Sequence, residues 1–229
     1  MSLRLQLSGI SKRYGEGAAS VLALDSVSLA LAAGEFLVVE GPSGSGKSTL
    51  LSICGLLESA DEGNMRFDGV AVERLTAEQR CGQRRRSIGF IFQHHQLIPA
   101  MTVFENIAYP LVLNREPRAR IKSQVELLMD RVGLGARRNH LPKRLSGGER
   151  QRTAIARALI KRPRIVIADE PSASLDHQRA HECLTLMREL NTEIGASFLI
   201  ASHDPFVIGH CDRKIILRDG RLVNGAAVV

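Results

Sequence analysis

The sequence predicts an α/β fold, with a mixed β-sheet, an additional antiparallel β portion and an inserted α-helical subdomain. Three observations support this prediction. Strand-like alternation dominates the first 40 residues, a glycine-rich loop then follows a short apolar strand, and helix signals replace strand signals between residues 94 and 162. We therefore expect one domain, in which residues 1–93 and 163–229 form an α/β core and residues 94–162 form the helical subdomain.

Strands are expected near both ends of the chain. The segments LRLQLSGI and DSVSLAL alternate apolar and polar residues, as half-buried strands do. The short runs EFLVVE, MRFDG, SIGFIF, RIVIAD and SFLIAS are typical of further strands. KIILRDGRLV predicts a hairpin with Asp219 and Gly220 at its turn. A helix is expected after the glycine-rich loop, from about Gly46 to Leu57.

Capping-box patterns predict where two helices of the subdomain begin. Thr102 is followed three residues later by Glu105, and Ser146 is followed in the same way by Glu149. In this pattern each side chain satisfies a backbone N–H of the other residue at the start of a helix. The second of these helices is expected to extend to about Lys161.

Two more helices are indicated by apolar spacing and by their ends. Pro117 suits the first turn of a helix, and the residues that follow it form one apolar face: Ile121, Val125, Leu128 and Val132. Asp176 is expected to cap a long helix that Gly195 ends. The apolar face of this long helix consists of Cys183, Leu184, Met187 and Leu190.

The composition narrows the classes of function. The chain has 229 residues, 44% of them hydrophobic, with a net charge of +7 and a pI of about 9.7. This balance favours anionic partners, such as nucleotides, nucleic acid or an anionic membrane surface. The N-terminus lacks the apolar core of a secretion signal, and no stretch has 18 uninterrupted apolar residues. We therefore expect no secretion signal and no membrane span within the chain.

The four cysteines predict reduced thiols. Cys54, Cys81, Cys183 and Cys211 lie far apart, so neither a zinc site nor a disulfide framework is expected. Cys54 follows Lys47 by seven residues on the same predicted helix. We expect Cys54 to be a small buried residue, and the alternative is a reactive thiol near the glycine-rich loop.

The segment GPSGSGKST, residues 41–49, matches the phosphate-binding pattern G-x-x-x-x-G-K-[ST] between a strand and a helix. Glycines let the backbone turn its N–H groups toward phosphate oxygens, and the helix N-terminus adds positive potential. We expect Lys47 to reach the β and γ phosphates and Ser48 to bind Mg²⁺. The expected ATP-binding residues of this loop are Gly41, Pro42, Ser43, Gly44, Ser45, Gly46, Lys47, Ser48 and Thr49. The core is therefore expected to be a P-loop NTPase of RecA-like type.

Two acidic residues complete the expected hydrolytic site. The apolar run of RIVIADEP delivers Asp169 and Glu170 to the carboxyl end of a strand, where open α/β sheets bind ligands. Asp169 suits the carboxylate that holds Mg²⁺, and Glu170 suits a general base for the attacking water. On their own, two acids at the end of a strand would be an ordinary solvated turn, but the phosphate loop upstream favours the catalytic interpretation.

LSGGERQ, residues 145–151, predicts a second anion site. Ser146, Gly147 and Gly148 lie at a helix N-terminus, where backbone N–H groups point outward, and Glu149 satisfies the cap. This segment resembles the signature motif of the ATPases of ABC transporters. The resemblance extends over nearly the whole chain, with the other motifs in the order of that family.

The resemblance assigns further site residues. It implies that Tyr14 stacks on adenine, that Gln93 senses Mg²⁺ and the attacking water, and that His203 contacts the γ-phosphate. Together with Lys47 and Glu170, Gln93 and His203 make up the expected catalytic set. The segment ASLD, residues 173–176, stands where the family contacts the opposite subunit through the residue matching Asp176. The family usually shows Ser-Ala in the first two positions of this segment, whereas this chain has Ala-Ser.

The resemblance implies a dimeric ATPase that acts at a membrane. In the family, nucleotide lies between the phosphate loop of one subunit and the signature serine of the other. The chain has one copy of each, so the resemblance implies a homodimer, or a pair with another ATPase subunit, around two ATP and Mg²⁺. It further implies ATP hydrolysis that drives a separate membrane permease, with the chain peripheral on the cytoplasmic face of the inner or plasma membrane.

The segment after Gln93 indicates which subfamily of ABC transporters the chain resembles. FQHHQLIPAMTVFENIAYPLVL looks like the type that serves lipoprotein release, macrolide-type export or the transporter-like complex of cell division. An amino-acid importer and a non-transport ATPase acting on nucleic acid or the division machinery are the alternatives. No nucleic-acid partner is expected, because 229 residues leave no room for the coiled-coil arms or second cassette of such ATPases.

The same segment is a candidate docking surface. Residues 94–113 carry many apolar side chains, so a short helix of a membrane subunit is expected to lie against them, with His95 at an exposed position. The alternative is that these side chains form the core of the helical subdomain.

Overall fold

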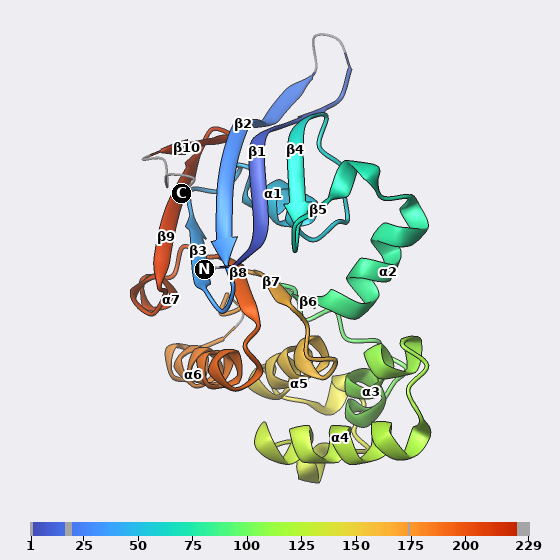
Figure 1. Cartoon of the computed structure of the whole chain (residues 1–229). Helices are drawn as coiled ribbons and strands as arrows, with labels where there is room; N and C mark the ends of the chain where they lie inside the picture. The colour runs from blue at the N-terminus through green and yellow to red at the C-terminus, as the bar shows by residue number, and fades with distance from the viewer. Residues whose placement is uncertain (1, 17–19, 174, 224–229) are drawn as a thin grey trace.

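The computed structural model describes residues 2–16, 20–173 and 175–223 (Figure 1). Within these residues the strands form two sheets. The first is antiparallel and has the order β2-β1-β4-β5. Its strands are β1 (Leu3–Tyr14), β2 (Val21–Ala32), β4 (Glu62–Phe67) and β5 (Val70–Ala71). This sheet is the antiparallel portion that the sequence predicts.

The second sheet is mixed and has the order β10-β9-β3-β8-β7-β6. Adjacent strands are parallel except β9 and β10, which form the predicted antiparallel hairpin. Its strands are β3 (Phe36–Glu40), β6 (Ile88–Ile91), β7 (Ile165–Asp169), β8 (Ser197–Ala201), β9 (Arg213–Arg218) and β10 (Arg221–Val223). The strand before the phosphate loop, β3, therefore lies inside the sheet between β9 and β8.

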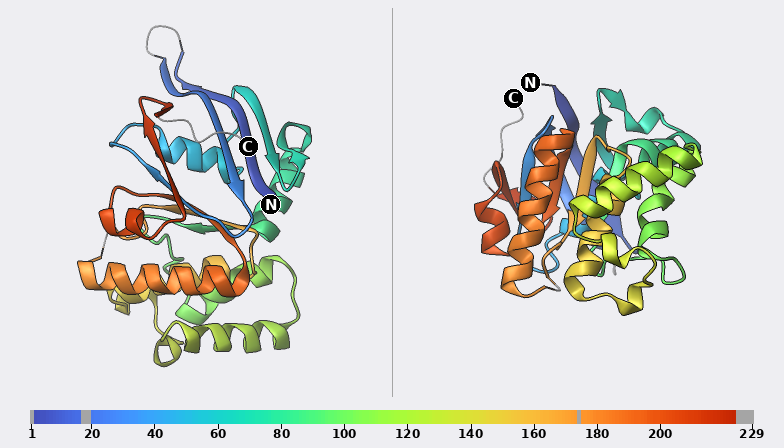
Figure 2. Two further views of the ribbon diagram at one scale, coloured as in Figure 1. Left: turned by 60° about the vertical axis from the view of Figure 1, so that its left-hand side comes forward. Right: turned by 90° about the horizontal axis from the view of Figure 1, so that it is seen from below.

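The α-helices are α1 (Lys47–Cys54), α2 (Ala77–Ser87), α3 (Val103–Leu113), α4 (Arg118–Arg131), α5 (Gly147–Leu159), α6 (His177–Ile194) and α7 (Pro205–Gly209). Helix α1 lies between the two sheets, and α3, α4, α5 and α6 lie together on one side of them (Figures 1 and 2). Short 3₁₀ turns cover Val72–Arg74, Gly135–Arg137 and Pro142–Arg144. These helices and the two sheets confirm the predicted fold class.

Three apolar cores hold the layers together. One fills the space between the antiparallel sheet and the mixed sheet and includes α1. The second lies on the opposite face of the mixed sheet, under α5 and α6. The third joins α3, α4 and α5. Because α5 contributes to both the second and the third core, it connects α3 and α4 to the sheet that carries the phosphate loop.

The predicted helix ends mostly match the structure. Thr102 and Ser146 form capping boxes with Glu105 and Glu149, and Asp176 accepts a hydrogen bond from the Arg179 N–H. The end of α5 at Leu159, with Ile160 as its C-cap, agrees with the predicted end at about Lys161. One prediction of length is wrong, because the helix after the phosphate loop ends at Cys54, where the next residue is a glycine that caps it.

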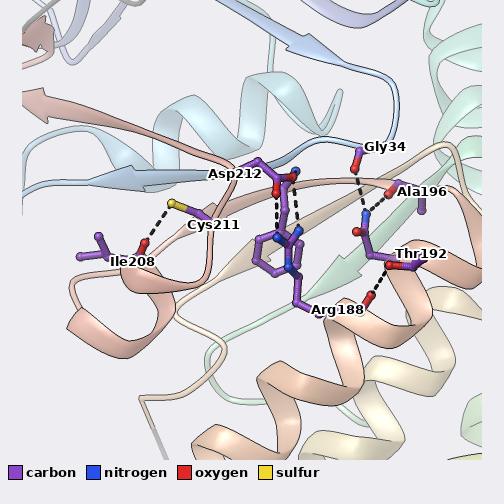
Figure 3. A network of polar contacts seen from close by, with 9 residues as sticks. Gly34, Arg188, Thr192, Ala196, Ile208, Cys211 and Asp212 are labelled. Atoms are coloured by element: carbon purple, nitrogen blue, oxygen red, sulfur yellow. Dashed lines mark hydrogen bonds and ion pairs between the residues drawn. The ribbon is translucent and has the colours of Figure 1, made fainter.

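Helix α6 is anchored to the mixed sheet by Arg188 (Figure 3). Its guanidinium donates to both carboxylate oxygens of Asp212, at 2.6 and 3.2 Å, and lies 4.7 Å from the centre of the Phe36 ring. Asp212 also accepts a hydrogen bond of 2.8 Å from the Phe36 N–H. Because Arg188 is on α6 and Phe36 begins β3, these contacts fix the helix that Asp176 caps relative to the strand that leads into the phosphate loop.

Candidate nucleotide-binding and hydrolysis site

A cleft of about 880 Å³ lies where β3, β7 and β8 end. It contains almost all of the predicted site residues of the core. The predicted residues that line it are Tyr14, Gly41, Pro42, Ser43, Gly44, Gly46, Lys47, Ser48, Thr49, Gln93, Asp169, Glu170 and His203. Ser45 is the exception within the loop, since its side chain is buried. The cleft is large enough for a nucleotide.

Glycines shape the phosphate loop. Gly44 and Gly46 have φ of 79° and 100°, a backbone region that other residues rarely adopt. A Cβ on Gly41 would lie 2.2 Å from the carbonyl oxygen of Leu217 on β9, so only glycine fits against that strand. The loop therefore runs directly over the sheet, and the first N–H groups of α1 face the cleft.

The Lys47 side chain lies inside the phosphate loop. Its Nζ donates hydrogen bonds to the carbonyl oxygens of Gly41 (2.7 Å) and Pro42 (2.9 Å). These two contacts hold the ammonium group across the mouth of the loop. A bound phosphate there would meet the charge of Lys47 together with the N–H groups at the start of α1.

The hydroxyl and carboxylate expected to hold Mg²⁺ lie together. Ser48 Oγ donates a hydrogen bond of 3.0 Å to Asp169 Oδ2, and burial raises the pKa of the Asp169 carboxyl. Gln93 lines the same cleft. A hydroxyl, a carboxylate and an amide oxygen are donors that suit Mg²⁺. The described residues contain no cluster of three or more His, Cys, Asp or Glu that could hold a metal.

Glu170 and His203 form a pair at the edge of the cleft. The Oε1 atom of Glu170 lies 2.8 Å from Nδ1 of His203, and the His203 side chain is 73% exposed. The other Glu170 oxygen, Oε2, is buried and has no hydrogen-bond partner among the described residues. Glu170 also has φ of 44°. A carboxylate on a strained backbone, with one oxygen buried and unsatisfied, is typical of a catalytic position.

Tyr14 also lines the cleft. Its ring is 39% exposed, and its hydroxyl donates a hydrogen bond to Glu58. The strand pairing places Tyr14 opposite Val21, and Val21 and Leu22 also line the cleft as exposed apolar residues. This apolar end suits a planar base.

The sequence reasoning missed several lining residues. Val21, Leu22 and Ala23 come from β2, and Asp219 and Gly220 come from the β9–β10 turn. The exposed apolar pair at the start of β2 gave no recognisable signal, because strand alternation alone does not show which residues meet a ligand. The hairpin turn was predicted, but its position over the phosphate loop follows only from the sheet order.

The signature residues do not line this cleft. Ser146 caps α5, and its Oγ accepts a hydrogen bond from the Glu149 N–H. Glu149 in turn accepts hydrogen bonds from the Ser146 N–H and from Arg137 Nε, both at 2.7 Å. These contacts, that of Arg137 first, lower the pKa of Glu149 to about 2. The remaining signature residues form the first turn of α5, in which Gly147 is partly exposed and Gly148 is buried.

Asp176 lies close to the signature turn. A Cβ on Gly148 would lie 3.4 Å from Cδ of Arg179, and Arg179 pairs with Asp176. The signature turn and the start of α6 therefore share one edge of the molecule. Of the ASLD segment, Ser174 lies outside the described residues.

The candidate docking segment differs from its prediction. His95, expected to be exposed, is only 6% exposed, and Val103 and Ile107 are fully buried in the core of the helical subdomain. Burial and the nearby Arg150 lower the pKa of His95. At the turn itself, the exposed residues are His94, Gln96, Pro99 and Ala100, because the chain turns inward at His95. Farther along the segment, Glu105, Val112 and Leu113 on α3 are also exposed.

Comparison with known proteins identifies the family. A family model described as ABC transporter matches residues 24–173. The chain belongs to the ABC transporter family. As the predicted resemblance indicated, it is an ATP-binding and ATP-hydrolysing subunit of this family.

Relatives of known name match nearly end to end. The lipoprotein-releasing system ATP-binding protein LolD of Bordetella pertussis is 44% identical over 218 residues, which are 95% of this chain and 94% of the relative. The protein of the same name from Bordetella avium is 44% identical over 96% of each chain. These matches show that the likeness extends beyond the residues of the family model.

Solved ABC structures share the fold. The ATP-binding cassette MJ0796, in a dimeric post-hydrolysis state bound to ADP and Pi, has a TM-score of 0.88 and 36% identity, and the match covers 95% of this chain and 96% of that one. CbiO1 of Clostridium perfringens, part of the ABC transporter complex cbiONQ, has a TM-score of 0.87 and 27% identity, with coverage of 97% and 88%. In the described residues, no helix of this ABC subunit is long and apolar enough to cross a membrane.

Proposed function

We propose that two copies of this chain close around two ATP molecules and drive a membrane permease that releases lipoproteins. The observation that carries the choice of cargo is the 44% identity to lipoprotein-releasing ATP-binding proteins over 95% of the chain. The motif order and the likeness to a dimeric cassette support the pairing of two copies.

The core cleft would hold the nucleotide and its metal. Tyr14 stacks on adenine, the phosphate loop from Gly41 to Thr49 binds the phosphates, and Lys47 reaches the β and γ phosphates. Ser48, Asp169 and Gln93 would hold Mg²⁺, which would neutralise charge on the phosphate oxygens. The contact of Ser48 with Asp169 supports this donor set.

Glu170 and His203 would act on the attacking water. The Glu170 carboxylate accepts the proton of the water, while His203 holds the carboxylate through Nδ1 and faces the γ-phosphate. The 2.8 Å contact between the two side chains supports this division of roles. The unsatisfied Oε2 of Glu170 is the oxygen that remains available to the water.

The signature turn would complete the site of the other copy. Ser146, Gly147, Gly148 and Glu149 lie apart from the cleft of their own chain, at the start of α5. Because Ser146 Oγ accepts from the Glu149 N–H, its hydroxyl proton stays available to donate to a phosphate across the interface. Asp176, beside the same edge, would contact the partner copy.

The chain would act at the cytoplasmic face of the inner membrane through a separate permease. Export of another substrate, an amino-acid importer and an ATPase of nucleic acid or cell division are the competing functions, and the end-to-end relatives favour lipoprotein release over them. No nucleic-acid partner is proposed. The exposed residues at the start of the docking segment, His94, Gln96, Pro99 and Ala100, would meet the permease.

Co-purification and cargo release test this function together. A tagged chain is purified from solubilised membranes, the permease bound to it is identified, and the complex is returned to proteoliposomes that contain a lipoprotein. We expect ATP to release the lipoprotein, and the Glu170→Gln variant to release none. Co-purification with an amino-acid permease, or ATP-driven uptake without release, would contradict the proposed cargo.

A further inference from the structure

The turn after Gln93 holds two consecutive residues in the left-handed backbone region. The φ angle is 61° at His95 and 44° at Gln96. Residues other than glycine keep this conformation only where surrounding contacts hold them in it. The backbone bonds of the turn are local, from the His95 N–H to the Phe92 carbonyl (2.9 Å) and from the Gln96 N–H to the His94 carbonyl (2.6 Å). Contacts from outside the turn must therefore offset the strain.

Arg157 on α5 makes such contacts. Its guanidinium donates one hydrogen bond to the carbonyl oxygen of His95 (2.7 Å) and one to that of Gln96 (2.6 Å). Burial lowers the pKa of Arg157, and no carboxylate among the described residues offsets that burial. The planar guanidinium can bind two neighbouring acceptors at once, which an ammonium group does less well. The partly buried guanidinium of Arg157 therefore binds the carbonyl oxygens of both strained residues.

Arg157 lies on the helix that connects the signature turn to the segment containing Gln93. Helix α5 has Ser146 as its N-cap, and Arg157 lies on the same helix about three turns later. Gln93 lines the nucleotide cleft two residues before His95. A single rigid helix therefore joins the signature turn to the segment that presents Gln93.

We propose that Arg157 is a positioning residue for ATP hydrolysis. By holding the strained turn, it keeps the Gln93 side chain at the cleft and ties it to the helix that presents Ser146. The inference rests on the roles proposed above for Gln93 and Ser146. It assigns Arg157 no contact with the nucleotide.

The Arg157→Gln variant tests this proposal, with Arg118→Gln, an exposed arginine at the start of α4, as the matched control. Hydrogen exchange of residues 92–98 should become at least tenfold faster in Arg157→Gln, whereas exchange of β3 should not change. The kcat for ATP should fall at least tenfold with KM within twofold, because the phosphate loop and Tyr14 are untouched. Arg157→Lys should lie between the wild type and Arg157→Gln in both measurements.

A second substitution tests whether backbone strain is the cause. Asparagine tolerates the left-handed region better than glutamine does, and the Gln96 side chain is exposed. Adding Gln96→Asn to Arg157→Gln should therefore recover several-fold of the lost kcat and slow the exchange of the turn. No recovery of either measurement would show that the strained turn is not what Arg157 supports.

Three results would overturn the proposal. In the first, the kcat and the hydrogen exchange of the turn in Arg157→Gln lie within twofold of those in Arg118→Gln. In the second, hydrogen exchange of β3 becomes faster by the same factor as that of the turn. In the third, the turn of Arg157→Gln exchanges faster while kcat stays normal. Gln93→Ala is measured alongside. A normal kcat in Gln93→Ala would reject the proposed role of Gln93, whereas a slow Gln93→Ala beside a normal Arg157→Gln would reject the role of Arg157 alone.

Discussion

The Nδ1 atom of His203, two residues after β8, lies 2.8 Å from the Oε1 atom of Glu170, the residue after β7. The two strands are parallel neighbours, so the sheet itself brings this pair together. The pairing leaves the second oxygen of Glu170 without a hydrogen-bond partner among the described residues. This relationship makes Glu170 the first residue to test.

Glu170→Gln should bind ATP normally and hydrolyse it about a hundredfold more slowly or worse, because an amide cannot accept the proton of the attacking water. The shape of the cleft and the contacts of Lys47 stay unchanged. Steady-state ATPase assays and nucleotide-binding titrations measure the two effects. Glu189→Gln, an exposed position on α6, serves as the control, and hydrolysis by Glu170→Gln at the rate of that control would rule out the general-base role.

Mixing two inactive variants should restore activity if the sites are shared between copies. Ser146→Arg blocks the signature turn and Lys47→Ala weakens phosphate binding, so each alone should be nearly inactive. A mixed dimer contains one site with both groups intact. ATPase rate against mixing ratio should therefore rise to a maximum between the two pure variants. If mixed dimers form and no mixture exceeds the variants alone, the sites are not shared.

The thiols should react in the order of their exposure. Cys81 on α2 is exposed, whereas Cys54 and Cys183 are buried, and burial raises the pKa of Cys54 strongly and that of Cys183 to about 11. An alkylating reagent should modify Cys81 in the native protein and reach Cys54 only after denaturation. Alkylation should leave the ATPase of the native protein unchanged. The Cys81→Ser variant removes the fast-reacting thiol. If alkylation of the native variant modifies Cys54 and abolishes the ATPase, Cys54 is not buried as described.

The Arg137–Glu149 pair predicts a pH dependence of stability. Its contacts lower the pKa of Glu149 from 4.5 to about 2, so the folded state binds this proton less readily than the unfolded state. The stabilisation is complete above about pH 4.5 and is lost as the pH falls toward 2. Because Arg137 is 44% exposed, we expect on the order of 1–2 kcal/mol after solvent screening.

Urea unfolding of the wild type and Glu149→Gln at several pH values measures this contribution. The difference in unfolding free energy should be present at pH 6, shrink between pH 4.5 and pH 3, and be smaller when Arg137→Ala is the background. A difference that does not change with pH would show that Glu149 acts through its neutral hydrogen bonds alone.

The sequence predicts correctly those segments whose structure is specified by residues close together in the chain. The phosphate loop has its own backbone requirements at Gly44 and Gly46, and the capping boxes of α3 and α5 act within four residues. In each case the residues that specify the structure are neighbours in the chain. Tyr14, Gln93 and His203 reached the site through resemblance, and the structure does place them in the cleft.

Helix α2 was missed although its capping box is complete. Thr76 accepts a hydrogen bond from the Gln79 N–H, and the Gln79 side chain accepts one from the Thr76 N–H. The helix buries none of its residues, so it has no apolar period to detect. The capping pattern of Thr76 and Gln79 could have predicted this helix, whereas its apolar spacing could not.

The position of His95 could not be read from local sequence. Its burial depends on a left-handed turn that α5, more than fifty residues later in the chain, holds in place through Arg157. The order of the strands in the mixed sheet is likewise a matter of distant pairing. Such long-range contacts explain why Asp219 and Gly220 were not expected at the nucleotide cleft.

The place of β3 in its sheet has a consequence for how this protein is made. Its two neighbours, β8 and β9, belong to residues 197–218, while β3 itself ends at Glu40. The carbonyl of Leu217 packs against Gly41, and the Gly220 N–H bonds to the Ser45 carbonyl (3.1 Å). On the ribosome, the strand that delivers the phosphate loop therefore emerges long before either partner exists. The nascent chain cannot assemble its nucleotide cleft until residues 197–220 have been translated, and the loop stays without its native support until then.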